Sequence, residues 1–267
     1  DILDNCMKPY GGFNHNIQTL RIVTLLENKY YDFIGLNLTI ETLDGLIKHN
    51  GPIKNLTLYK KMLSKNLFDN KISFSKFPSM EAQVAAISDD IAYNNHDLED
   101  GLRAGLFTID NLLSIPFVSK LIKKHVSKKN FFREQIIINQ IVRELINYMV
   151  IDVIETSKKN IRRFKIQNIQ DVYNQNSLIV DFSSNMKKVD KQIKNFLRIM
   201  MYNNKKVLTN TLKGKKIIKK LFNFLSKNPK RFINNSLSGD DITHRDIADF
   251  IAGMTDRYAI NLYNKIK

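Results

Sequence analysis

The chain has 267 residues, which is long enough to bury a large core in one domain or in two small ones. Its composition, 43% apolar and 25% charged, is typical of a globular protein rather than a disordered one. Because Gly and Pro are scarce, we expect long helices rather than a sheet with many tight turns. The single cysteine, Cys6, excludes an internal disulfide and a cysteine-based metal cluster.

The formal net charge of +16 predicts attraction to polyanions such as nucleotides and nucleic acid. Lys, Asn and Ile are also the residues that an AT-rich genome encodes, so composition alone leaves compositional drift as an alternative. No apolar run reaches the roughly 18 residues of a membrane helix, and the first residues lack the basic and apolar regions of a signal peptide. We therefore expect no membrane partner and a cytoplasmic location.

Apolar residues recur at helical spacing through most of the chain, which predicts an all-α fold. In chain order, the predicted helices cover residues 15–31, 38–52, 80–107, 109–126 with an interruption at Pro116, and 131–161. After about residue 162 we expect a connector with one short extended piece, two basic amphipathic helices, and a terminal helix over 243–266. This change of texture predicts two parts, residues 1–161 and residues 162–267.

One helix differs from the rest of this basic chain. It lies in SMEAQVAAISDDIAYNNHDLEDGLRAGLF, residues 79–107, and is rich in acids. At about 100° per residue, one stripe of this helix is apolar and should face the core: Val84, Ile87, Ile91, Leu98 and Leu102. A second stripe, roughly opposite, carries Asp89, Tyr93, Asp97 and Asp100.

The second stripe has two interpretations. It is either a solvated acidic face or a binding face. The adjacent alanines, together with Tyr93 and the pair Asn94 and Asn95, favour binding. A carboxylate that points into a cleft is a good ligand for Mg²⁺, Mn²⁺ or Fe²⁺. One carboxylate is not a metal site, and the histidines show no HExxH motif and no pair four residues apart. In the dipeptide His96-Asp97 the two side chains diverge by about 100° on a helix, so we do not expect them to share a metal.

Three blocks of the sequence resemble the HD-domain deoxynucleoside triphosphate triphosphohydrolases, the dGTPase-like family of bacteria. They are YGGFNHNIQTLRIVTLLE with GLNLTIETLDGLIKHNGP, then SMEAQVAAISDDIAYNNHDLEDGLRAGLF, and finally DFIAGMTDRYAINLY. They occur in the family's order and together span nearly the whole chain. The resemblance implies an HD-domain-like helical bundle with a C-terminal helical extension.

The resemblance also implies an activity, namely cleavage of a dNTP, with dGTP expected, into a deoxynucleoside and inorganic triphosphate. It implies homo-oligomers and a divalent metal, Mg²⁺ or Mn²⁺ or Fe²⁺. The roles that it implies are metal ligand for Asp89, support of the metal site for Asp90, contact with the deoxyribose for Tyr93 and Asp97, general acid or base for His15, and phosphate contact for Arg143.

The sequence departs from the family in one respect. The family's other metal ligands, an early His and a His-Asp pair, precede the block that corresponds to YGGF, which here starts at Tyr10. We therefore expect that the chain carries one ligand of four and is inactive by itself. It is then a fragment of a longer protein, a split-gene product or a degenerate relative, and we favour N-terminal truncation or a split gene. The alternative is a non-catalytic module that binds nucleotide or single-stranded nucleic acid, although the absence of Trp weakens the stacking expected of a single-strand binder. A third interpretation is a structural oligomerisation fragment.

Overall fold

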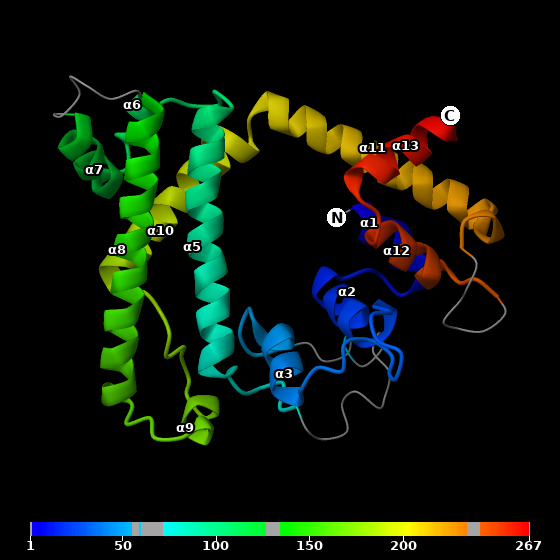
Figure 1. Ribbon diagram of the computed structural model, residues 1–267, viewed down its shortest axis with the longest axis horizontal. Coiled ribbons are helices and arrows are strands. Elements are labelled where there is room, and N and C mark those ends of the chain that lie inside the picture. Colours follow the sequence, from blue (N-terminus) through cyan, green and yellow to red (C-terminus); the bar gives the residue numbers. More distant parts are fainter. Residues whose placement is uncertain (1, 55–58, 60–71, 127–133, 234–240, 267) are drawn as a thin grey trace. The chain divides into compact units, whose positions relative to one another are not determined.

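A computed structural model of the chain describes residues 2–54, 59, 72–126, 134–233 and 241–266 (Figure 1). Throughout these residues the regular secondary structure is helical, so the predicted all-α, HD-domain-like fold is confirmed. The chain forms two compact units. The first unit contains the described residues of 1–47, 55–72 and 208–267, and the second unit contains those of 48–54 and 73–207.

The second unit is built on two long helices, α5 (Met80–Arg103) and α8 (Glu134–Arg163), which pack side by side (Figure 1). The helix α10 (Ser184–Leu197) packs on α5 and continues into a π-helical turn, η4 (Arg198–Tyr202). The remaining helices of this unit are α6 (Ile109–Leu112), α7 (Pro116–Val126), which packs on α8, and α9 (Ile169–Tyr173).

Local sequence explains where these helices begin. The Ser79 side chain accepts a hydrogen bond from the backbone N–H of Ala82 at 3.3 Å, so it caps the N-terminus of α5. Pro116, which the sequence analysis expected to interrupt a helix, is the first residue of α7, where its missing N–H costs nothing. The predicted helix 131–161 corresponds to α8, whose description starts at Glu134.

The core of the second unit lies among α5, α7, α8 and α10. Its fully buried members include Leu98, Val118, Leu145, Met149, Ile193 and Leu197. Ile91 and Leu98 face this core as predicted, but Val84 of the same stripe is 48% exposed, so its assignment to the core was wrong. Helical periodicity identifies the side of α5 that faces inward, but it does not show how far the neighbouring helices extend along that side.

The connector after residue 162 contains no strand in the described residues. The expected extended piece is instead held by a side chain of α5. Gln83, which is 3% exposed, accepts hydrogen bonds from the backbone N–H groups of Ile179 and Val180 at 2.8 and 3.0 Å. Its own Nε2 donates to the Pro78 carbonyl at 2.9 Å. A single buried amide therefore satisfies backbone groups that a strand partner would otherwise satisfy.

The first unit combines both ends of the chain. Its helices are α1 (Ile2–Met7), η1 (Lys8–Tyr10), α2 (His15–Arg21), η2 (Ile22–Leu26), α3 (Ile40–Lys48), most of α11 (Lys205–Lys227), η5 (Pro229–Arg231), α12 (His244–Ala252) and α13 (Asp256–Lys265). Arg21 on α2 forms a buried ion pair with Asp249 on α12 at 2.5 Å. That pair ties the early helix to the C-terminal segment.

The terminal helix predicted over 243–266 is two helices, which corrects the sequence analysis. α12 ends at Ala252, and the Thr255 side chain accepts a hydrogen bond from the backbone N–H of Tyr258, so it caps a new helix. The predicted division at residues 161 and 162 stays a prediction, and the two compact units follow other boundaries. Between the predicted helices 38–52 and 80–107, residues 55–58 and 60–71 lie outside the described residues.

Candidate active-site helix

The acidic stripe of α5 faces outward. Asp89 is exposed, Tyr93 is 58% exposed and Asp97 is half-buried. These residues lie four apart, about one helical turn, so their side chains form a row along one side of the helix. The structure therefore brings three of the predicted site residues together in one accessible row.

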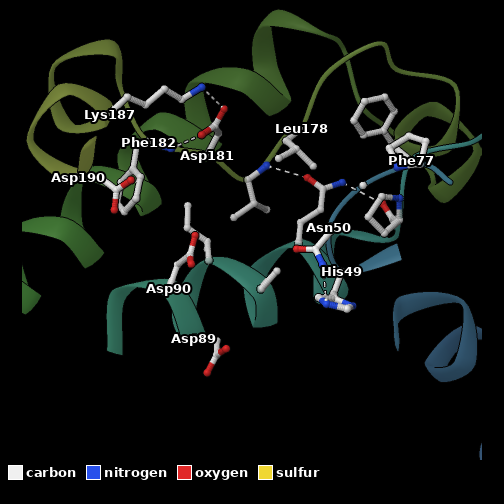
Figure 2. A pocket seen from close by; sticks show the side chains of 17 residues that line it. His49, Asn50, Phe77, Asp89, Asp90, Leu178, Asp181, Phe182, Lys187 and Asp190 are labelled. Atoms are coloured by element: carbon white, nitrogen blue, oxygen red, sulfur yellow. Dashed lines mark hydrogen bonds and ion pairs between the residues drawn. The ribbon is translucent and has the colours of Figure 1, made fainter. Parts of the chain in front are cut away.

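A cavity of about 570 Å³ lies at the Asp89 end of this row, between α5, the connector around Leu178–Phe182, and the start of α10 (Figure 2). Its wall is partly apolar, formed by side chains such as Pro52, Phe77 and Phe182. The carboxylates of Asp89, Asp90, Asp181 and Asp190 also line it. A volume of this size is within the range of small-ligand pockets.

Lysines from α10 neutralise three of these four carboxylates. Lys194 lies 3.1 Å from both Asp90 and Asp190, and Lys187 pairs with Asp181. Asn94 of α5 donates a further hydrogen bond to Asp190 at 2.9 Å. The contacts of Lys194 with Asp90 and of Asn94 with Asp190 join α10 to α5, and the Lys187 pair joins α10 to the connector.

Asp89 differs from its three neighbours. It forms no hydrogen bond or ion pair with the described residues. Figure 2 shows its carboxylate directed away from Asp90, Asp181 and Asp190. Asp89 is thus an exposed carboxylate at the rim of the cavity, and both oxygens are available to a ligand.

Burial and hydrogen bonds together set the pKa values of Asp190 and Lys194 on α10. It raises the pKa of Asp190, and the hydrogen bond from Lys194 opposes that rise without cancelling it. Burial would lower the pKa of Lys194, but hydrogen bonds to Asp190 and Asp90 outweigh burial, so its pKa is raised. Lys194 therefore stays cationic at neutral pH beside the cavity.

Asp97 is held by a residue that the sequence analysis did not identify. Tyr202, in the π-helical turn after α10, donates its hydroxyl proton to Oδ2 of Asp97 and also hydrogen-bonds with Tyr93. Burial raises the pKa of Tyr202, and its hydrogen bonds to Asp97 and Tyr93 raise it further. The hydroxyl thus remains a donor throughout the physiological pH range.

The other predicted site residues lie elsewhere. Arg143 is exposed on α8, on the side opposite the buried Leu145, and it is not among the described residues that line the cavity. His15 is the first residue of α2 in the first unit, where it lines a separate cavity of about 470 Å³. The roles of both residues stay predictions.

The described residues fit one position of a metal site but not a whole site. Within the part of the chain that the structure describes, no group of three His, Cys, Asp or Glu side chains is placed to hold a metal ion. His96 does not share a ligand position with Asp97, because its Nδ1 lies 4.0 Å from Glu99 while Asp97 contacts Tyr202. Asp89 has the right chemistry for a hard cation, but the described residues provide no companion ligand.

Four residues of this region could not be identified from the sequence. Gln83, Asn94, Lys194 and Tyr202 all act through partners about a hundred residues away in the chain. Only the unusual Asn pair at 94 and 95 gave a signal, because amides are uncommon on the inward side of a helix.

Comparison with known proteins connects this geometry to a family. Residues 180–265 match the model of a phosphohydrolase-associated domain. The chain is 51% identical over 262 residues to a deoxyguanosinetriphosphate triphosphohydrolase-like protein of Pelagibacter ubique, with 98% of the chain and 70% of the relative covered. Proteins with the same name from Caulobacter sp. and Rickettsia rickettsii are 40% and 38% identical, with 100% and 99% of the chain and 69% and 70% of the relatives covered.

These relatives, together with the matched domain, place the chain among the phosphohydrolases of the HD type. More specifically, the chain belongs to the family of deoxyguanosinetriphosphate triphosphohydrolase-like proteins. The resemblance drawn from the three sequence blocks is therefore confirmed. Among the described helices, none combines the length and the apolar character that crossing a bilayer requires.

Proposed function

We propose that the α5 row is part of the active site of a dNTP triphosphohydrolase that acts on dGTP. The observation that carries the proposal is a contrast at the cavity. Asp89 bonds to none of the described residues, whereas the other acids that line the cavity are neutralised. The names of the relatives support the substrate and the reaction. The expected homo-oligomer, the cytoplasmic location and the role of Asp90 remain predictions.

In this reaction water attacks the α-phosphorus of dGTP, and the bond from that phosphorus to the 5′-oxygen breaks. The 5′-oxygen leaves with a proton as deoxyguanosine, and tripolyphosphate carries the new oxygen. A divalent cation, Mg²⁺ or Mn²⁺, would polarise the phosphate and help to deprotonate the water. Asp89 would provide one of its ligands.

The remaining roles concern binding and proton transfer. Asp97 and Tyr93 would contact the deoxyribose, since a carboxylate can accept a hydrogen bond from a sugar hydroxyl and a ring can pack on the sugar face. His15 would exchange a proton with the attacking water or the leaving oxygen. Arg143 would contact the triphosphate, whose charge a basic protein also attracts over longer distances.

The test is dGTP hydrolysis with Mg²⁺ or Mn²⁺, with tripolyphosphate resolved from pyrophosphate and phosphate. It should be run on the chain alone and on the chain preceded by an upstream segment that carries the family's His and His-Asp ligands. Asp89→Asn should abolish tripolyphosphate release, and Asp100→Asn, an exposed acid on the same helix, should not. Absence of tripolyphosphate from both forms would overturn the proposal.

A second candidate function, binding of single-stranded DNA, is favoured by one observation. Between Asp190 and Asp240 the sequence contains no Asp or Glu, and α11 lies within this segment. The lysines exposed on α11 are Lys205, Lys206, Lys213, Lys215, Lys216, Lys219 and Lys227. A helix with this charge attracts a phosphate backbone without reading its sequence.

Fluorescence anisotropy with a labelled oligothymidine would test this second function. Binding should weaken steeply with salt, and the double change Lys215→Glu with Lys216→Glu should reduce both the affinity and the salt dependence. The matched control is Lys158→Glu with Lys159→Glu, an exposed lysine pair on α8. Equal effects of the two pairs would show that only the net charge matters, and would reject α11 as the binding surface.

A further inference from the structure

The π-helical turn η4 determines where Tyr202 points. Ile193, earlier on α10, is fully buried. At about 100° per residue, a regular helix would place Tyr202 about half a turn away from Ile193, on the solvent side. Instead the backbone N–H of Asn203 bonds to the carbonyl of Arg198, five residues back, at 3.2 Å. This wider turn rotates Tyr202 back toward the side of α10 that carries Asp190 and Lys194.

That side of α10 is the one that contacts α5. Lys194 and Asp190 meet Asp90 and Asn94 there, and Tyr202 meets the same helix at Asp97 and Tyr93. The Tyr202 ring is partly buried against the core of the second unit, and this packing fixes the position of its hydroxyl. π-turns of this kind occur frequently at functional sites.

The hydrogen bond from Tyr202 uses only one of the two carboxylate oxygens of Asp97. Tyr202 donates to Oδ2, whereas Oδ1 accepts no hydrogen bond from the described residues. A carboxylate anchored through one oxygen keeps its other oxygen in a defined direction, and that oxygen can still accept a hydrogen bond from a ligand. In a dNTP the only sugar hydroxyl is the 3′-hydroxyl, because position 2′ carries none and the 5′-oxygen is esterified.

We propose that Tyr202 is a positioning residue for the sugar site, in that it fixes Asp97 and Tyr93 so that the other oxygen of Asp97 can accept a hydrogen bond from the 3′-hydroxyl of the substrate. This inference rests on the proposed function. The new element is that a residue of the π-turn, and not α5 alone, sets the positions of the side chains that contact the sugar. Tyr202 itself acts through Asp97.

The experiment compares the hydrolysis kinetics of dGTP with those of 2′,3′-dideoxyGTP, which lacks the 3′-hydroxyl. The protein is the chain preceded by the upstream segment that carries the other metal ligands. Tyr202→Phe keeps the ring and removes the hydroxyl. We expect KM for dGTP to rise about tenfold, the amount that corresponds to one hydrogen bond to a charged group, with kcat within about twofold. KM for the dideoxy analogue should be nearly the same in Tyr202→Phe as in the wild type. The variant should therefore lose most of the difference in KM by which the wild type prefers dGTP.

The matched control is Tyr148→Phe. Tyr148 is a half-exposed tyrosine of the same unit whose hydroxyl bonds to none of the described residues, and its loss should change neither KM. The double variant Tyr202→Phe with Asp97→Ala should be no worse than Asp97→Ala alone, because Tyr202 acts through Asp97. A merely structural role for Tyr202 would instead weaken both nucleotides equally and add to the Asp97 effect, and either result overturns the proposal.

A second measurement separates this proposal from the proposed function. Binding of 2′-deoxyguanosine and 2′,3′-dideoxyguanosine to the chain can be followed by NMR without metal and without hydrolysis. If wild-type protein releases no tripolyphosphate but prefers deoxyguanosine, and Tyr202→Phe abolishes that preference, the proposed activity fails while the role of Tyr202 stands. If the wild-type protein binds both nucleosides equally or binds neither, the role of Tyr202 is rejected.

Discussion

Lys194 on α10 places its Nζ 3.1 Å from Oδ2 of Asp90 on α5, so the acid that immediately follows Asp89 is neutralised by a different helix. The same Nζ lies 3.1 Å from Asp190, four residues earlier on α10. Lys194 therefore neutralises two of the four carboxylates that line the cavity, and Lys187 neutralises Asp181. Among the described residues, Asp89 has no such partner. This arrangement also joins α10 to α5.

Lys194→Met should destabilise the protein. Asp190 would keep Asn94 as its remaining partner while its carboxylate stays largely buried. We expect a loss of about 2 kcal/mol in the free energy of unfolding, as for other hydrogen bonds to charged groups. Urea denaturation measures it. The control is Lys187→Met, whose more exposed pair with Asp181 should contribute less than about 1 kcal/mol, and equal losses in the two variants would contradict the account.

Asp190 should make stability depend on pH. Its pKa in the folded protein is raised above the usual value of 3.8, mainly by burial, so above pH 3.8 the folded state holds a proton that the unfolded state has lost. The contribution of this group is therefore fully present below pH 3.8 and is lost as the pH rises through the folded pKa. Across that window the stability of Asp190→Asn relative to wild type should increase. If urea titrations showed a difference in unfolding free energy between Asp190→Asn and wild type that does not vary with pH, this prediction would be wrong.

Tyr202 should resist ionisation. Burial, followed by its hydrogen bonds to Asp97 and Tyr93, raises its pKa well above the usual 10.0. In an alkaline absorbance titration of the folded protein, wild type and Tyr202→Phe should therefore show the same tyrosinate signal up to about pH 11, since the missing residue would not have ionised. A smaller signal in the variant over that range would mean that Tyr202 titrates as an ordinary tyrosine.

Gln83 should be essential for the connector around Leu178–Phe182. Gln83→Met would leave the N–H groups of Ile179 and Val180 without their acceptor, at a cost of about 2–4 kcal/mol for two buried donors. Hydrogen exchange should accelerate at these two amides. Gln175→Met removes only one donor, to the Asp171 carbonyl, and provides the control. Unchanged exchange at Ile179 and Val180 would show that Gln83 does not hold the segment.

The sequence predicted much of this fold because its signals are local. The predicted interruption at Pro116 falls at the first residue of α7, and the period of α5 correctly places Asp89, Tyr93 and Asp97 on one outward side. Where neighbouring helices decide the outcome, periodicity fails, as at Val84.

The rest of the candidate site depends on features without a local signature. The π-turn at Arg198–Tyr202 breaks the regular rotation of α10, so its side-chain directions do not follow from spacing. Tyr202 meets Asp97 across 105 residues, and the cap at Thr255 divides a helix whose apolar period continues across the break. Such pairings arise from tertiary packing, which a single sequence does not encode locally.

Hydrolysis of dGTP in ¹⁸O-labelled water by the chain preceded by the upstream segment, with the products analysed by mass spectrometry, tests the central claim most directly. The account predicts label in tripolyphosphate and none in deoxyguanosine, because water attacks the α-phosphorus. Release of this product should disappear in Asp89→Asn and persist in Asp100→Asn. Label in deoxyguanosine, pyrophosphate as the first product, or full activity of Asp89→Asn would contradict it.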